Sequence, residues 1–349
     1  MSRPGARKID RVKPRCMFGL ALVAGSALTA TLILRAASGQ APAPASSEAR
    51  AIAYLAREVP AWRREHPCYS CHNNGDAARA LVAALGRAPD VKPALDDTLA
   101  WLAAPGRWDT NGGGEGGADD KRLARIQFAH ATTAAYAAAL VPKAAVDSAA
   151  AIVAADQQPD GSWRLDASDS VGSPATYGTA LATVFARRTL VASGLPSLAE
   201  RVAHAGRWLA RAEVTNVPEA AAIVFANAQA TTTPQGDNWR AALEILQKGQ
   251  GRNGGWGPYI TSPAEPFDTA LAMLALHTLA RRPSLAAPVF TKATLAGAVT
   301  AGRAYLEREQ LVDGSWNETT RPAGQTSYAQ RISTTGWALL ALIETTGPK

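Results

Sequence analysis

The segment Gln310-Leu311-Val312-Asp313-Gly314-Ser315-Trp316 decides the fold, because close copies of it stand at two earlier places in the 349-residue chain. The copies are Gln157-Gln158-Pro159-Asp160-Gly161-Ser162-Trp163 and Gln250-Gly251-Arg252-Asn253-Gly254-Gly255-Trp256. All three obey the pattern Q-x-x-[DN]-G-[SG]-W. In this pattern Asp-Gly or Asn-Gly supplies the positive φ that ends a helix. We expect the Gln side chain to bond free backbone groups and the Trp to fill the space between neighbouring units.

An Ala- and Leu-rich run follows each of these turns. The runs begin at Thr179, Thr269 and Thr335 and are apolar nearly all round, so we expect them to be buried helices. The segments before the turns, such as 241–248, place charges on one face. Each unit is therefore predicted to be an outer amphipathic helix, a Gly-rich turn and an inner buried helix.

This template predicts an all-α fold, a single α/α toroid of about six helical hairpins. The predicted units are residues 48–86, 95–141, 145–190, 198–230, 238–281 and 295–345. The pattern resembles the prenyltransferase and squalene-cyclase repeat family, whose signature is this Gln-to-Trp turn. The resemblance covers nearly all of 48–349 and is most specific in the three turns.

The resemblance implies two kinds of activity, and the sequence lacks the motif of each. Squalene–hopene cyclases protonate their substrate with a DxDD motif and have two toroids. Here Asp96-Asp97 and Asp119-Asp120 are isolated pairs, which we interpret as helix-capping and loop charges. Protein prenyltransferases bind zinc through Asp, Cys and His in later repeats, where this chain has no cysteine. Whether the chain is an enzyme therefore stays open at this point.

A CxxCH motif, Cys68-Tyr69-Ser70-Cys71-His72, occupies the turn of the first predicted hairpin. In an exported protein this spacing indicates covalent attachment of one haem c, with both thiols bonded to the porphyrin and His72 as the proximal iron ligand. We expect residues 66–76 to form the attachment loop. A CxxC disulfide, part of a zinc site and a chance match are the alternatives.

The N-terminal segment predicts export. Residues 1–35 hold seven basic residues and one acid, and residues 17–34 are free of charge. We interpret residues 1–40 as a signal peptide or a membrane anchor, followed by a short linker to residue 47. The remaining chain has 29 basic and 28 acidic residues, so its charge gives no reason to expect nucleic-acid binding. We expect a periplasmic protein, with residues 17–34 as a candidate inner-membrane anchor and no other membrane contact.

His130 is the candidate for the sixth, distal position on the haem iron. It begins the second inner run, at the end of the toroid where the turns lie. His66, His204, His277 and Met273 are weaker candidates, and the Gly-rich stretch 112–117 could cover a haem edge.

The leading functional hypothesis is an exported c-type haem protein of electron transfer or haem redox chemistry, with an unknown redox partner or small molecule. The first alternative is an enzyme that uses the toroid cavity on an apolar or isoprenoid-like substrate. The second is a binding module without haem.

Overall fold

The computed structural model describes residues 45–112, 121–165, 170–227, 234, 236–321 and 327–346. The predicted export segment, residues 1–40, lies outside these ranges. The described residues form twelve α-helices and no strand. The helices are α1 (Ser47–Glu65), α2 (Ala78–Ala84), α3 (Lys92–Leu102), α4 (Lys121–Ala137), α5 (Lys143–Ala155), α6 (Gly178–Ser193), α7 (Ala199–Leu209), α8 (Val217–Ala226), α9 (Asp237–Lys248), α10 (Pro266–Ala280), α11 (Lys292–Glu309) and α12 (Tyr328–Thr345). None of the helices in this part of the chain is long and apolar enough to cross a membrane.

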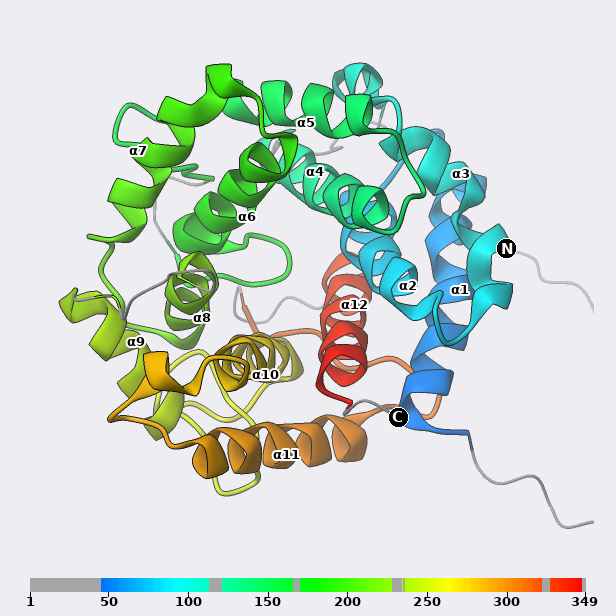
Figure 1. Ribbon diagram of the computed structural model, residues 1–349. Helices are drawn as coiled ribbons and strands as arrows, with labels where there is room; N and C mark the ends of the chain where they lie inside the picture. The colour runs from blue at the N-terminus through cyan, green and yellow to red at the C-terminus, as the bar shows by residue number, and fades with distance from the viewer. Residues whose placement is uncertain are drawn as a thin grey trace, which may run out of the picture. The chain divides into compact units, whose positions relative to one another are not determined.

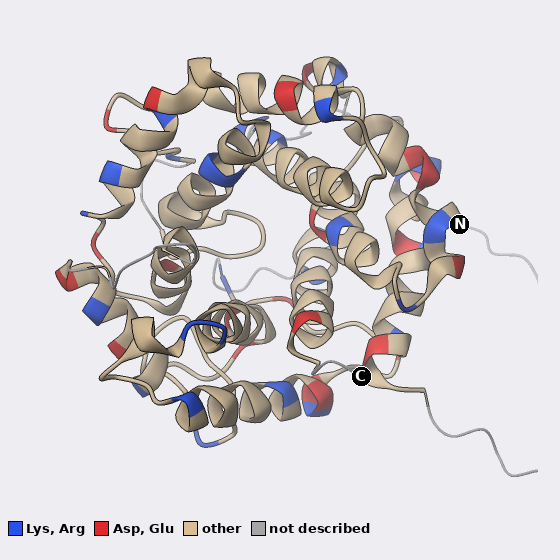
Figure 2. Ribbon diagram, in the orientation of Figure 1, with Lys and Arg blue, Asp and Glu red and all other residues tan. Residues whose placement is uncertain are grey.

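The helices form two concentric rings (Figure 1). The odd-numbered helices make the outer ring and the even-numbered helices the inner ring, so six helical hairpins follow one another around the toroid. The prediction of an all-α toroid of about six hairpins is confirmed. Most charged segments lie on the outer ring (Figure 2), as expected for amphipathic outer helices around apolar inner ones.

The Gln side chains of the three repeated turns each join two units. Gln310 donates from Nε2 to the Gly314 carbonyl oxygen of its own turn and to the Ser47 carbonyl oxygen of α1, both at 2.9 Å. Gln250 donates in the same way to Gly254 at 2.8 Å and to Ala298 of α11 at 2.9 Å. Each turn is therefore bonded to the next outer helix, and the last turn is bonded to the first helix of the ring.

The Trp side chains anchor the same turns to the outer helix of their own hairpin. Trp163, Trp256 and Trp316 are buried, and their Nε1 atoms donate to backbone carbonyl oxygens of α5, α9 and α11 at 2.7, 2.8 and 2.8 Å. Each Trp backbone N–H donates to a Thr hydroxyl of the inner helix. In units five and six the acceptors are Thr269 and Thr335, the residues at which the predicted inner runs begin.

The inner helix of unit three begins where the sequence predicts, since α6 starts at Gly178, next to Thr179. The Trp163 N–H donates to Thr183 at 3.0 Å, one helical turn beyond Thr179. In this unit the Thr that accepts from the Trp N–H therefore lies inside the helix rather than at the start of the run.

The turn glycines allow each turn to pack directly on the next outer helix. Gly314 has φ +93°, and a Cβ built there would lie 2.4 Å from the Arg50 carbonyl oxygen of α1. Gly254 has φ +89°, and a Cβ built there would likewise lie 2.4 Å from the Ala301 carbonyl oxygen of α11. Any larger side chain at these positions would be both strained and in collision with backbone.

A Gly314→Ala variant should therefore destabilise the toroid at the contact that closes it. Backbone strain alone predicts a loss of about 1–3 kcal/mol in the free energy of unfolding, and the collision with α1 adds to it. The matched control is Gly297→Ala on α11, where a Cβ meets nothing within 4 Å. Because Ala is a better helix former, the control should gain about 0.5–1 kcal/mol. Urea denaturation followed by circular dichroism measures both, and equal stability of the two variants would contradict this role of Gly314.

Candidate functional site

The CxxCH segment lies between α1 and α2, in the turn of the first hairpin as predicted. A π-helix, His72–Ala77, leads from it into α2. Cys68, Cys71 and His72 line one pocket of about 360 Å³, together with aromatic rings that include Trp62 and Phe128. The structure thus brings the three predicted attachment residues together beside a pocket of the size that small-molecule sites have.

Packing contacts within the protein also account for these residues. Cys68 is a buried thiol whose sulfur accepts a hydrogen bond of 3.4 Å from Trp62 Nε1. His72 Nδ1 shares a hydrogen bond of 2.8 Å with the Ser333 hydroxyl of α12. Burial lowers the pKa of His72 to about 4, so the imidazole is neutral at pH 7. Haem c attachment at these residues, with His72 as proximal ligand, stays a prediction.

No group of three or more His, Cys, Asp or Glu side chains in the described ranges is arranged to hold a metal ion. His130 lies on α4, but the residues of α4 that line the CxxCH pocket are Lys121, Ala124, Arg125 and Phe128. The His130 ring instead stacks on Phe185 of α6 at 4.2 Å. The structure therefore places His130 outside the pocket of the three motif residues, and its distal role stays a prediction. Residues 113–117 of the Gly-rich stretch lie outside the described ranges.

A buried carboxylate stands at the centre of the toroid. Asp76, in the π-helix, is 1% exposed. Its Oδ1 accepts a hydrogen bond from the Tyr177 hydroxyl, and its Oδ2 accepts from Gln127 Nε2 at 2.8 Å and Trp337 Nε1 at 3.3 Å. Burial raises the pKa of Asp76, while the Arg79 guanidinium and these hydrogen bonds oppose the shift. With both oxygens accepting, Asp76 ties four units of the ring together.

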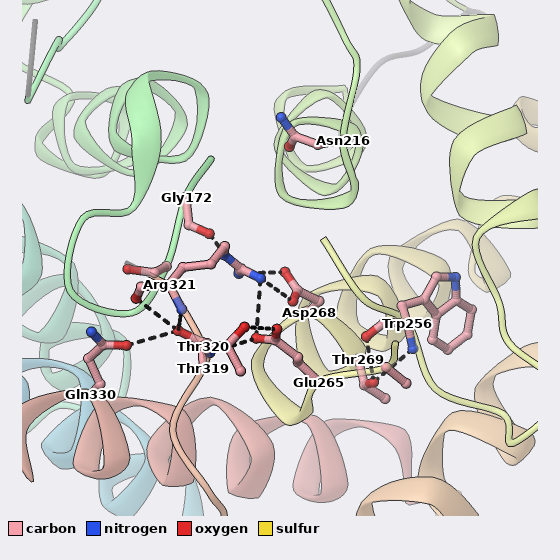
Figure 3. A network of polar contacts seen from close by, with 12 residues as sticks. Gly172, Asn216, Trp256, Glu265, Asp268, Thr269, Thr319, Thr320, Arg321 and Gln330 are labelled. Atoms are coloured by element: carbon pink, nitrogen blue, oxygen red, sulfur yellow. Dashed lines mark hydrogen bonds and ion pairs between the residues drawn. The ribbon is translucent and has the colours of Figure 1, made fainter. Parts of the chain in front are cut away.

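A second buried acidic cluster lies at the start of α10 (Figure 3). The Arg321 guanidinium donates to both oxygens of Asp268, at 2.9 and 3.0 Å, and also to Glu265 at 3.2 Å. Its Nη2 donates to the Gly172 carbonyl oxygen at 2.8 Å. Asp268 is fully buried, and Glu265 accepts a further hydrogen bond of 2.8 Å from the Thr320 hydroxyl.

Two carboxylates therefore share one guanidinium in this cluster. If both were ionised, the buried group would hold one negative charge more than Arg321 neutralises, which is costly away from water. Burial raises the pKa of Asp268 to about 7; the Arg321 charge opposes the shift, and the neighbouring Glu265 adds to it. The pair therefore holds a proton at pH values where an ordinary carboxyl has lost it.

Aromatic rings line the centre of the toroid between these acids. Trp337 of α12 lies 5.5 Å from Phe185 and 6.0 Å from Phe267, measured between ring centroids. Phe267 directly precedes Asp268, so the first turn of α10 contributes both to the acidic cluster and to the aromatic centre. The loop before α6 reaches into the ring (Figure 1) and connects the two acids, because Tyr177 bonds Asp76 and Gly172 bonds Arg321.

Neither buried acid was predicted from the sequence. Asp268 directly precedes the run that begins at Thr269, and Asp76 directly precedes the Ala-rich segment 77–84 of the first unit. A single acid on a helix expected to be buried all round is the signal that could have identified them. Their partners Tyr177 and Arg321 come from loops of other units, and no sequence pattern joins them.

Solved structures with this architecture include type II terpene cyclases. The apo form of the cyclase MstE from Scytonema is 16% identical, with a TM-score of 0.52 over 85% of this chain and 96% of that chain. A variant of the same enzyme in complex with geranylgeranyl dihydroxybenzoate as substrate gives the same values. A protein from Actinoplanes has a TM-score of 0.53 at 16% identity, over 86% of this chain and 99% of that chain. No family model and no curated protein matches the chain. The chain thus has a terpene-cyclase-like helical toroid fold.

The leading functional hypothesis, a c-type haem protein of electron transfer, is wrong. The chains that share this toroid over most of their length include terpene cyclases, so the comparisons favour the alternative, an enzyme of the toroid cavity. The error came from giving five residues, 68–72, more weight than the repeats. The structure gives residues of that segment packing partners on α1 and α12.

The raised pKa of Asp268 predicts how stability changes with pH. The pKa is about 7 in the folded protein and 3.8 for an unperturbed carboxyl. The stabilisation from holding this proton is complete below the lower value and is lost as the pH rises through about 7. The free energy of unfolding of the wild type should therefore fall, relative to Asp268→Asn, as the pH rises from about 4 to 8. Urea titrations at several pH values measure this difference, and a difference that stays constant would contradict the shifted pKa.

Proposed function

We propose that this chain is an enzyme that transfers a proton to an apolar, isoprenoid-like substrate inside the toroid. The observation that carries the proposal is the Glu265–Asp268 pair, a half-buried and a fully buried carboxylate that share the single charge of Arg321. The solved cyclase MstE, whose toroid has the same architecture, binds geranylgeranyl dihydroxybenzoate and gives merosterolic acid A. That likeness supports the apolar substrate class.

The neutral carboxyl group of the pair is the proton donor in this proposal. A general acid works best when its pKa lies near the working pH, because it is then both protonated and able to release the proton. Asp268 meets this condition, since its pKa is raised to about 7. When the O–H bond breaks and the proton moves to the substrate, Arg321 stabilises the carboxylate that remains.

The aromatic centre would receive the apolar part of the substrate. Phe267 directly precedes Asp268 and packs edge to face against Trp337 of α12, and ring faces stabilise developing positive charge. The interior also excludes bulk water, which protects a reactive intermediate from hydrolysis. The proposal also places the enzyme outside the cytoplasm, because residues 1–40 predict export.

The direct test is turnover of polyprenyl substrates, with products identified by mass spectrometry. Asp268→Asn should lower kcat by about 10²–10⁴-fold, the usual loss when a general acid is removed. The matched control is Asp96→Asn on α3, whose side chain is 59% exposed. Circular dichroism should confirm that both variants are folded. Full activity of a folded Asp268→Asn protein would refute the assignment of the acid.

A second variant separates proton donation from a merely structural role. Glu265 adds to the raised pKa of Asp268, so Glu265→Gln should lower that pKa. Activity that needs the protonated acid falls as the pH rises, and in Glu265→Gln this fall should occur at lower pH than in the wild type. The pH dependence of kcat measures the shift. Identical profiles would show that the two carboxylates are not coupled.

A further inference from the structure

A second feature of the toroid interior is a cavity of about 180 Å³ among the C-terminal halves of α6, α8, α10 and α12. Three arginines line it, Arg79, Arg188 and the exposed Arg281, together with the rings of Phe185, Phe225 and Trp337. It lies toward the helix ends that face away from the repeated turns, so it is separate from the acidic cluster of α10.

Arg79 is a buried cation with unused donors. The residue is 6% exposed, and its Nε and Nη2 atoms have no hydrogen-bond partner. The guanidinium lies over the Trp337 ring at 4.0 Å. Asp76 is the acid whose carboxyl interacts with the charge of Arg79. Both oxygens of that carboxyl already accept hydrogen bonds, from Tyr177, Gln127 and Trp337.

Arg188 places a second cation beside the first. It lies 4.8 Å from the Phe225 ring centroid and donates one hydrogen bond, at 3.3 Å, to the Phe225 carbonyl oxygen. Burial, together with the charges of Arg79 and Arg187, lowers the pKa of Arg188 to about 10. The two like charges therefore repel each other inside one cavity.

The other titratable groups around the cavity do not neutralise this charge. His277 and Arg281 lie at the rim and share a contact of 3.4 Å with each other. Glu344 also lines the cavity, and no ion pair joins it to Arg79 or Arg188 in the described residues. His130 lies near both guanidiniums and is neutral, and its Nδ1 atom has no hydrogen-bond partner.

We propose that this cavity binds the anionic head group, a carboxylate or a phosphate, of an apolar ligand. Buried charges are normally paired, and planar guanidinium groups match both kinds of oxyanion through parallel hydrogen bonds. The faces of Trp337 and Phe225 already lie against cations, so a positively charged ligand would be repelled here. An anion would instead satisfy the unused donors of Arg79 and reduce the repulsion between the two cations.

This inference deepens the proposed function, on which it rests only for the apolar part of the ligand. It adds that the substrate, or a molecule that regulates the enzyme, has one negatively charged end. Binding can be measured without turnover, so a failure of one proposal is distinguishable from a failure of the other.

The test titrates the wild-type protein with four eight-carbon probes and follows tryptophan fluorescence and calorimetric heat. Octanoate and octyl phosphate should bind, whereas octanol and octyltrimethylammonium should bind at least about tenfold more weakly. Comparison of octanoate with octyl phosphate identifies which head group is preferred. Equal binding of octanol and the two anions, or no binding of either anion, would overturn the proposal.

Arg188→Met then asks whether the cation serves binding or folding. Loss of a charge-assisted hydrogen bond should weaken anion binding by at least about tenfold. Without ligand the variant should be as stable as the wild type or more so, because a half-buried charge without an ion-pair partner has been replaced by an apolar group of similar length. A purely structural arginine would instead show a loss of stability and unchanged binding, which would overturn the proposal.

The matched control is Arg187→Met, at the neighbouring position on the same helix. Arg187 donates to the Val202 carbonyl oxygen of α7 at 3.3 Å and is not among the residues of the cavity. It should bind the anionic probes as the wild type does. Weakened binding in both variants would indicate a general loss of positive charge and would contradict a specific site.

Discussion

A hydrogen bond from a Gln side chain to the backbone of the next outer helix is the contact on which the toroid depends. In the last unit it joins Gln310 to Ser47, two residues that are 263 positions apart in the chain. The bond is possible only because Gly314, with its positive φ, lets the turn approach α1 closely. Closure of the ring then gives the inner helices neighbours on every side. It also creates the dry interior in which charged groups change their properties.

Both chemical features of the molecule follow from that enclosure. In water, Asp268 would be ionised at pH 7 and Arg188 would be an ordinary cation. Inside the ring, burial raises the pKa of Asp268 to about 7 and lowers that of Arg188 to about 10. These groups lower the stability of the folded protein, since buried and incompletely paired charges disfavour folding. Such costs are typical of positions that bind or transform a ligand.

Much of the fold could be predicted from the sequence because its determinants are local. The Gln, Gly and Trp of one turn lie within seven residues, and the periodicity of each helix is visible along the chain. The start of the inner run of unit three at Thr179 was predicted in this way, although the Trp163 N–H binds Thr183 one turn later. The site was harder to predict. Asp268 and Arg321 come from different units, 53 positions apart, and only the closed ring brings them together. The short motif at Cys68 to His72, in contrast, was easy to see and led to the wrong leading function.

The protonation state of the Glu265–Asp268 pair tests the account most directly. Carbon-13 NMR of the wild-type protein, labelled at Asp and Glu side-chain carboxyl carbons, follows each carboxyl from about pH 3 to pH 9, and assignment uses the Asp268→Asn and Glu265→Gln spectra. The account predicts a buried carboxyl signal that titrates near pH 7 and is absent from the Asp268→Asn spectrum. If both carboxyls instead stay ionised down to about pH 4, as ordinary surface acids do, the pair holds no proton at neutral pH and the proposed chemistry is wrong.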